Sequence, residues 1–197
     1  MKIGVLSIQG AISEHFKLLT MCGVEAVPVK NTQNLAAVNG LIIPGGESTT
    51  IGKLIEVAGL SMPIKERTKN NTLALFGTCA GMVLMAKEVL DGIDNQPILG
   101  LMNTRVKRNA FGRQRESFET SFEFKGIEGS LSGVFIRAPL IEEAGEEVEI
   151  LSKLNEGIIA ARQGNLLATS FHPELTEDHR IHHYFVKMCE NISCRLC

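Results

Sequence analysis

The chain has 197 residues, of which 44% are hydrophobic and 21% charged, so it is long enough to bury one substantial core. Its formal net charge of -2 provides no basic field for phosphate groups, which argues against a nucleic-acid partner. No apolar run approaches the roughly 20 residues that cross a bilayer, so we expect no membrane association and a cytoplasmic protein.

Residues 1–197 are expected to form a single domain, with a mobile tail over residues 193–197. The five cysteines are odd in number and irregularly spaced, which argues against a disulfide framework in a chain of this size. Three of them fall within residues 189–197, at spacings that match no closed zinc site. We therefore predict free thiols and no metal.

The first half of the chain alternates between two periodicities. Short apolar runs predict strands at residues 2–8, 25–29, 40–44 and 72–76, of which the first has the pattern of a buried strand. Apolar residues at helical spacing follow the first and third of these runs: Ile12, Phe16 and Leu19, then Ile51, Leu54, Ile55 and Ala58. Ser48 or Thr49 is a suitable N-cap for the second helix.

The second half has a different pattern. Short extended segments with Gly-containing turns occupy residues 104–171, which indicates antiparallel strands. A closing amphipathic helix follows, with an apolar stripe formed by Ile181, Phe185, Met188 and Ile192. Strands that alternate with helices are joined by right-handed crossovers. The chain is therefore predicted to be an α/β protein with a doubly wound, mostly parallel sheet, flanking helices and an added antiparallel portion.

Cys79 stands in the sequence GTCAG (residues 77–81), directly after a predicted strand. A nucleophile on a sharp turn between a strand and a helix needs small neighbours on both sides, because its backbone is strained and crowded. A following helix N-terminus favours the thiolate and leaves the amide of Ala80 free to bind an oxyanion. The alternative interpretation is a buried cysteine beside tightly packed glycines.

Two further motifs carry chemically useful groups. His172 and Glu174 are two residues apart in TSFHPEL, and an extended backbone would place both side chains on the same side, with the carboxylate orienting the imidazole. Taken alone, they are also compatible with a surface histidine beside a solvated glutamate. In IIPGGESTT, the glycines bring backbone N–H groups close to a ligand, and Gly46 is the candidate second oxyanion donor. That motif is equally compatible with a phosphate-binding turn or a plain helix-entry loop.

Together, PGGEST, GTCAG and FHPE, in this order, resemble the class I (triad) glutamine amidotransferases, which release ammonia from glutamine. GVLSIQG near the N-terminus, RNAFGRQ (108–114), GVFIRAP (133–139) and HPELTEDHR (172–180) resemble the branch that forms the glutaminase subunit of the two-component pyridoxal 5'-phosphate synthase, and the likeness covers nearly the whole chain. Residues 91–99 look slightly expanded and the CRLC tail is unfamiliar, but we expect neither to touch the chemistry.

The resemblance implies a role for each matching residue. Cys79 would be the nucleophile, His172 the general acid and base, and Glu174 the group that orients His172. The amides of Gly46 and Ala80 would hold the oxyanion. Glutamine would be bound by Gly46, Glu47, Ser48, Arg108, Ile136 and Arg137.

The same resemblance implies partners. The substrate would be L-glutamine, and the ammonia would pass to a synthase subunit that makes pyridoxal 5'-phosphate, in a large hetero-oligomer. The chain itself would need no cofactor and no metal. Glutaminase activity is expected to be weak until the synthase binds, because the loop at Gly45 and Gly46 is not yet set.

Three alternatives remain open at this point. One is a cysteine-dependent hydrolase or deglycase of the related fold. Another is a redox-sensing module in which Cys79 is oxidised and His172 is incidental. Finally, His179, His182 and His183 are spaced to bind a metal on one helix face, although a solvated helix face is the favoured interpretation.

Overall fold

The structure is a computed structural model, and it describes residues 1–92, 96–111 and 117–193. The helices are α1 (Ile12–Met21), α2 (Thr32–Ala36), α3 (Ser48–Val57), α4 (Ser61–Lys69), α5 (Ala80–Met85) and α6 (Arg180–Ser193), with a 3-10 turn η1 at Pro173–Leu175. The strands are β1 (Lys2–Leu6), β2 (Glu25–Val29), β3 (Gly40–Ile43), β4 (Ala74–Thr78), β5 (Ala86–Val89), β6 (Met102–Lys107), β7 (Ser117–Phe124), β8 (Ile127–Ile136), β9 (Leu140–Ala144), β10 (Glu149–Leu154), β11 (Gly157–Gln163) and β12 (Leu166–Thr169).

The main sheet has a parallel half and a mostly antiparallel half. Strands β2, β1, β3, β4 and β12 run parallel in that order, and β11, β9, β6 and β5 extend the sheet beyond β12, with β10 paired to β11. Strand β12 joins the halves, because it is parallel to β4 and antiparallel to β11. A separate antiparallel ribbon is formed by β7 and β8. The predicted fold class is confirmed.

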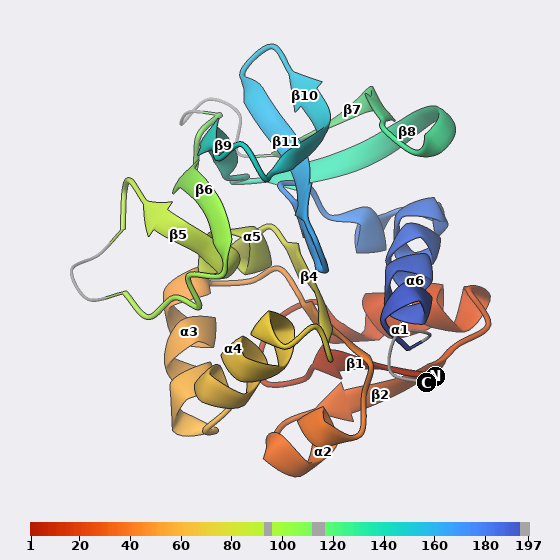
Figure 1. The fold of residues 1–197 in the computed structure, drawn as a ribbon. Helices are drawn as coiled ribbons and strands as arrows, with labels where there is room; N and C mark the ends of the chain where they lie inside the picture. Colours follow the sequence, from red (N-terminus) through yellow and green to blue (C-terminus); the bar gives the residue numbers. More distant parts are fainter. Residues whose placement is uncertain (93–95, 112–116, 194–197) are drawn as a thin grey trace.

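The inner parallel strands β1, β3, β4 and β12 are buried on both faces, as their continuous apolar runs predict, whereas β2 at the edge of the sheet is largely half-buried or exposed. Leu41 and Ile43 of β3 belong to the core beneath α3, α4 and α5, while Ile42 belongs to the core beneath α1 and α6. Figure 1 shows the two helical layers on opposite sides of the sheet. The ribbon of β7 and β8 extends the second core, to which Phe122 and Phe135 contribute.

Several local predictions need correction. Helix α3 is capped by Glu47, whose carboxylate accepts hydrogen bonds from the N–H groups of Thr49 and Thr50, so neither Ser48 nor Thr49 is the cap. A carboxylate satisfies two N–H groups at once, and its charge complements the helix dipole. The extended run predicted over residues 104–114 ends with β6 at Lys107. Residues 112–114 of that run lie outside the described part of the chain, and so do residues 194–197 of the expected tail.

Helices α2 and α4 and strands β5 and β9 are absent from the predicted elements. Helix α4 buries only Ile64 and Thr68, and its other large apolar side chain, Met62, is exposed, so the helix lacks a continuous apolar stripe that the sequence would show. Strand β9 gains its place from pairing with β6, which is a long-range contact. Local periodicity therefore identified the elements with strongly apolar faces and missed those that tertiary contacts define.

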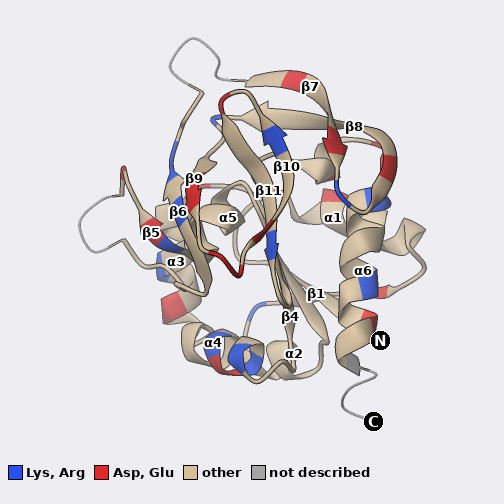
Figure 2. Cartoon of the chain, turned by 45° about the horizontal axis from the view of Figure 1, so that its top comes forward, with Lys and Arg blue, Asp and Glu red and all other residues tan. Residues whose placement is uncertain are grey.

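Charged side chains of both signs are spread over the helices and the outer strands (Figure 2). Some form exposed ion pairs, such as Lys17 with Glu177 at 2.8 Å. Such pairs contribute about 0–1 kcal/mol each to stability. Within the described residues, no helix has both the length and the apolar character needed to span a membrane.

Candidate active site

Three loops meet where β3, β4 and β12 end. These strands are neighbours in the parallel half of the sheet, so their carboxyl ends lie at one edge. Gly45 and Gly46 follow β3, Cys79 follows β4, and His172 follows β12. Ligands of open α/β sheets bind at this edge, because the loops after the strands open there. The topology therefore brings together three motifs that are far apart in the sequence.

Cys79 sits on a strained turn between β4 and α5. Its φ of 48° and ψ of -99° lie outside the regions that a side chain favours, and its N–H donates to the carbonyl of Thr169 at 2.8 Å. A Cβ at Gly77 would come within 2.5 Å of the backbone of Gly81, and one at Gly81 within 2.4 Å of the Ile43 carbonyl oxygen. The flanking glycines are therefore required by the close packing of α5 on the strands.

His172 and Glu174 contact each other directly, with 2.7 Å between His172 Nδ1 and Glu174 Oε1. The backbone is not extended as predicted, because Glu174 lies in the 3-10 turn η1 that begins at Pro173. The turn still places the Glu174 carboxylate in contact with the His172 ring. The backbone N–H of His172 donates to the carbonyl oxygen of Val134 in β8 at 2.8 Å, so the β7–β8 ribbon fixes the backbone of the histidine.

His172 is basic in this environment. Burial lowers the pKa of His172, but its hydrogen bonds to Cys79 and Glu174 and the negative charges of both groups outweigh burial and raise the pKa to about 10. The imidazolium is thus favoured when Cys79 is a thiolate. Cys79 is 8% exposed, and its Sγ lies 3.8 Å from the carbonyl oxygen of Ile136. The arrangement provides an accessible sulfur beside a proton carrier.

The loop after β3 packs against the histidine. A Cβ at Gly45 would come within 2.2 Å of the His172 ring, so this loop approaches the imidazole as only a glycine can. The N–H of Glu47 donates to Gln9 Oε1 at 3.3 Å, which ties the loop to the segment after β1. The N–H of Ala80 is at the first position of α5, where an amide has no partner within its helix.

A cavity of about 190 Å³ opens over Cys79. It is smaller than the roughly 300–1,000 Å³ typical of sites for drug-sized ligands, and so suits a molecule of amino-acid size. It is lined by Gly46, Glu47, Ser48, Cys79, Ala80, Val83, Arg108, Asn109, Ile136, Arg137, Pro139 and His172. Every predicted site residue except Glu174, which lies behind His172, lines it. A larger open hollow between the β7–β8 ribbon and β10 contains none of them.

The cavity wall carries both signs of charge. Arg108 Nη2 lies 3.5 Å from Glu47 Oε1. Burial acts to raise the pKa of Glu47, but hydrogen bonds from Thr50 and Thr49 and the charge of Arg108 lower it, so the carboxylate stays ionised. Arg137 and Asn109 hold positive φ angles of 43° and 47°, a strain that is typical of functional sites.

Gln96, from the segment 91–99 that looks expanded in the sequence, hydrogen-bonds to two residues of this wall. Its amide donates to Ser48 Oγ at 3.2 Å and accepts from Arg108 Nη1 at 3.1 Å. Gln96 thus connects two residues of the cavity. No sequence signal pointed to it, because a glutamine in an irregular segment has neither periodicity nor a motif.

The helix-face interpretation of the three histidines is wrong for His182. His182 is fully buried and its Nε2 lies 2.9 Å from Nδ1 of His15, whereas His179 is half-buried and His183 exposed. Sequence reasoning also missed His15, which is fully buried on α1 with its Nε2 at 3.6 Å from Glu174 Oε2. Within the described ranges, no group of three His, Cys, Asp or Glu side chains is arranged to hold a metal ion.

Comparison with known proteins identifies the family. The model of the SNO glutamine amidotransferase family matches residues 5–191. The pyridoxal 5'-phosphate synthase subunit PdxT of Geobacillus thermodenitrificans is 53% identical over 188 residues, which is 95% of each chain. The protein of the same name from Dehalococcoides mccartyi strain 195 is 52% identical over 193 residues, 97% of this chain and 98% of that one.

Solved structures agree with this result. A crystal structure of a glutamine amidotransferase has a TM-score of 0.91 at 49% identity and covers 95% of this chain and 98% of its own. A glutamine amidotransferase from Thermotoga maritima, at 12% identity and a TM-score of 0.64, is similar in fold alone over 99% of this chain and 85% of its own. The chain belongs to the SNO glutamine amidotransferase family.

Proposed function

We propose that this chain, acting as one domain over residues 1–197, is the glutaminase subunit of a pyridoxal 5'-phosphate synthase. It hydrolyses L-glutamine to L-glutamate and ammonia and passes the ammonia to a partner synthase. The observation that carries the proposal is the arrangement of Cys79, His172 and Glu174 beneath a cavity of amino-acid size. Membership of the family and relatives named as PdxT support it.

The first half of the reaction forms a thioester. The Cys79 thiolate attacks the side-chain amide carbon of glutamine, and the amides of Gly46 and Ala80 stabilise the negative oxygen of the tetrahedral intermediate. His172 then donates its proton to the departing nitrogen, and ammonia leaves. Glu174, 2.7 Å from His172 Nδ1, holds the ring with Nε2 directed toward the reacting atoms.

The second half regenerates the enzyme. Water loses a proton to neutral His172 and attacks the glutamyl thioester, and the resulting intermediate is held by the same two amides. Its collapse breaks the carbon–sulfur bond, releases glutamate and restores the Cys79 thiolate with His172 protonated. One glutamine and one water give one glutamate, one ammonia and one proton, which the new γ-carboxyl group of the product releases to solvent, so atoms and charge balance.

The cavity wall provides complementary groups for a free amino acid. We assign glutamine binding to Gly46, Glu47, Ser48, Arg108, Ile136 and Arg137, which all line the cavity. An arginine fork bonds both oxygens of an α-carboxylate, and an ionised glutamate attracts an α-ammonium. The contact between Arg108 and Glu47 keeps both side chains in place before substrate enters.

Ammonia needs a consumer nearby, because it is protonated and dispersed in bulk water. We propose that the chain docks on a pyridoxal 5'-phosphate synthase subunit in a large hetero-oligomer; its relatives are named as subunits of such a synthase, which supports the partner. We expect weak activity without the partner and a cytoplasmic location. The thiols of Cys22 and Cys79, which form no disulfide, agree with a reducing compartment.

The test measures glutamate release from glutamine by the purified chain, with and without an added pyridoxal 5'-phosphate synthase subunit. Cys79→Ala removes the nucleophile, and Cys22→Ala serves as the matched control, because Cys22 does not line the cavity and its thiol contacts the carbonyl of His179. We expect partner-stimulated release that Cys79→Ala abolishes and Cys22→Ala preserves.

The other outcomes distinguish the alternatives. Release that does not depend on the partner would keep the glutaminase reaction and reject the synthase partner. An absence of release, combined with hydrolysis of a peptide or an aldehyde adduct, would favour the hydrolase or deglycase. Peroxide reactivity of Cys79 that survives in His172→Ala, without any turnover in the native protein, would favour the redox sensor.

A further inference from the structure

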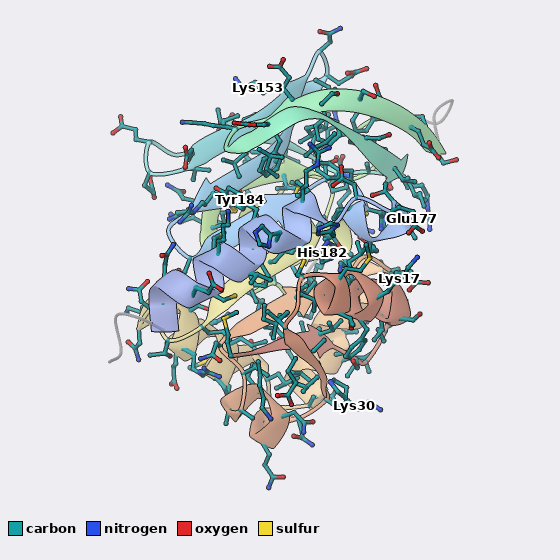
Figure 3. All side chains as sticks on the ribbon, turned by 90° about the vertical axis from the view of Figure 1, so that its right-hand side faces the viewer. Lys17, Lys30, Lys153, Glu177, His182 and Tyr184 are labelled. Carbon is teal, nitrogen blue, oxygen red and sulfur yellow. The ribbon has the colours of Figure 1, made fainter. Side chains whose placement is uncertain are left out.

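The polar contacts of the active site continue beyond Glu174 into the core. Oε1 of Glu174 contacts His172, while Oε2 faces Nε2 of His15 at 3.6 Å. Among the described residues, neither of these two facing atoms has a partner at a normal hydrogen-bond length. The other His15 nitrogen, Nδ1, lies 2.9 Å from Nε2 of His182. Figure 3 shows His182 on α6, which packs against α1, the helix that carries His15.

The three groups come from three separate elements: His15 from α1, Glu174 from η1 and His182 from α6. All three side chains are at most 4% exposed, so solvent does not substitute for a missing partner. Phe76 of β4 presents its ring to His182 with a centroid separation of 6.0 Å. The titratable groups that face His15 are Glu174 and His182, with the charge of His172 beyond the carboxylate.

Both core histidines are neutral. Burial, followed by His182 and His172, holds the pKa of His15 well below its usual value. Burial, followed by the charge of His179, lowers the pKa of His182 to about 3. Each ring therefore carries one N–H, and the question is which nitrogen bears it.

One arrangement of these protons satisfies the contacts. If His15 carries its proton on Nε2, that N–H points at Glu174, and the bare Nδ1 accepts from Nε2–H of His182. The atom left without a partner is then His182 Nδ1, an unprotonated nitrogen. The opposite arrangement points a lone pair of His15 at the carboxylate and leaves a buried N–H of His182 unpaired, which costs more.

We propose that His15 is a positioning residue, which acts through Glu174 by donating its Nε2–H to the carboxylate oxygen that His172 does not use, with His182 fixing the His15 tautomer. The inference rests on the proposed function, in which Glu174 orients His172. With both oxygens held, the carboxylate cannot rotate away from the imidazole. The 3.6 Å separation is longer than a normal hydrogen bond, as is common for catalytic contacts in an enzyme without substrate.

The test compares His15→Gln with His15→Asn. The glutamine amide nitrogen occupies the place of histidine Nε2 and can donate to Glu174, whereas the asparagine amide is one methylene too short. Both side chains are polar and similar in size, so the comparison separates the hydrogen bond from core packing even if His15→Leu does not fold. Leu19→Ala, one turn further along α1 and fully buried, controls for loss of stability.

Two measurements are made on each variant. The first is kcat and KM for glutamate release with the synthase subunit present. The second is the pH dependence of Cys79 alkylation by iodoacetamide, followed by mass spectrometry of the Cys79 peptide, which requires neither glutamine nor partner. If native protein releases no glutamate, the proposed function fails, yet the alkylation profiles still decide the role of His15.

We expect His15→Asn and His15→Leu to lower kcat about 10- to 100-fold with little change in KM, and to move the alkylation profile to higher pH. His15→Gln should restore both to near the native values, and Leu19→Ala should leave both unchanged. Equal loss in the Gln and Asn variants, or the same losses in Leu19→Ala, would overturn the proposal and reduce His15 to a packing residue.

Discussion

At the scale of single residues, charge and hydrogen bonding set the acid–base character of the side chains around the cavity. Short sequence motifs identified Cys79, His172 and Glu174 as candidate catalytic residues, but the acid–base character of His172 depends on its neighbours. Cys79 and Glu174 together make His172 basic, although burial acts in the opposite direction. Neighbouring side chains also position the residues of the cavity wall, since Arg108 contacts both Glu47 and Gln96.

Replacing Arg108 with lysine tests the recognition of the α-carboxylate. Lysine keeps the charge but loses the planar fork, so we expect KM for glutamine to rise by about tenfold or more while kcat changes little. Arg105→Lys is the matched control, because Arg105 pairs with Glu143 at 3.0 Å and does not line the cavity. An unchanged KM in Arg108→Lys would contradict the assignment.

At the scale of elements, the site depends on how closely α5 packs against the strands. The turn at Cys79 places α5 over β3 and β4, and the Ile43 carbonyl occupies the space in which a side chain at Gly81 would lie. Sequence reasoning predicted small residues here from the chemistry of a strained turn. The structure adds the reason, which is the close approach of helix and strand backbones.

Gly81→Ala should therefore destabilise the protein, although alanine favours a helix over glycine by about 1 kcal/mol. A Cβ at 2.4 Å from the Ile43 carbonyl oxygen forces a backbone shift, which costs up to about 3 kcal/mol and outweighs the propensity gain. We also expect lower activity, because the Ala80 amide moves with α5. Urea unfolding and glutamate release provide the measurements.

Gly92→Ala is the matched control for that substitution. A Cβ at Gly92 would meet its nearest atom at 3.4 Å, an ordinary contact, so its unfolding free energy should stay within about 0.5 kcal/mol of the native value. Equal stability of the Gly81 and Gly92 variants would show that α5 can move away from β3 without cost.

At the scale of the whole molecule, two buried neutral histidines make stability depend on pH. His15 and His182 have pKa values below the usual 6.5 in the folded protein, whereas both take up protons near pH 6.5 once unfolded. Stability should therefore fall as pH drops below about 6.5. His172 behaves oppositely: its raised pKa stabilises the fold fully below about pH 6.5, and this is lost as pH rises through about 10.

We expect His182 to lower the free energy of unfolding by about 1.5 kcal/mol between pH 6.5 and about pH 5, and His15 to add to this fall, while His172 is protonated in both states through most of the interval. Urea titrations across this range measure the slope. His182→Phe should make this slope shallower, and His183→Gln, at an exposed position of the same helix, should leave it intact. A slope that His182→Phe does not reduce would contradict the neutral state of His182.

The sequence by itself determined the α/β class, the strongly apolar strands and helices and the candidate triad, because these depend on local periodicity and on short motifs. It did not predict Glu47 as the cap of α3, the 3-10 turn that carries Glu174, or the approach of Gln96 to Ser48. Each of these depends on which side chain reaches which backbone or partner group.

Only the tertiary structure decided the surroundings of the triad. Adjacency of β3, β4 and β12 in the sheet brings the three loops together, and the crossing of α1, η1 and α6 brings His15 and His182 to Glu174. His15 and His182 are 167 positions apart in the chain. Local patterns report which face of an element is apolar, whereas burial of a polar group against a distant partner is a property of the assembled core.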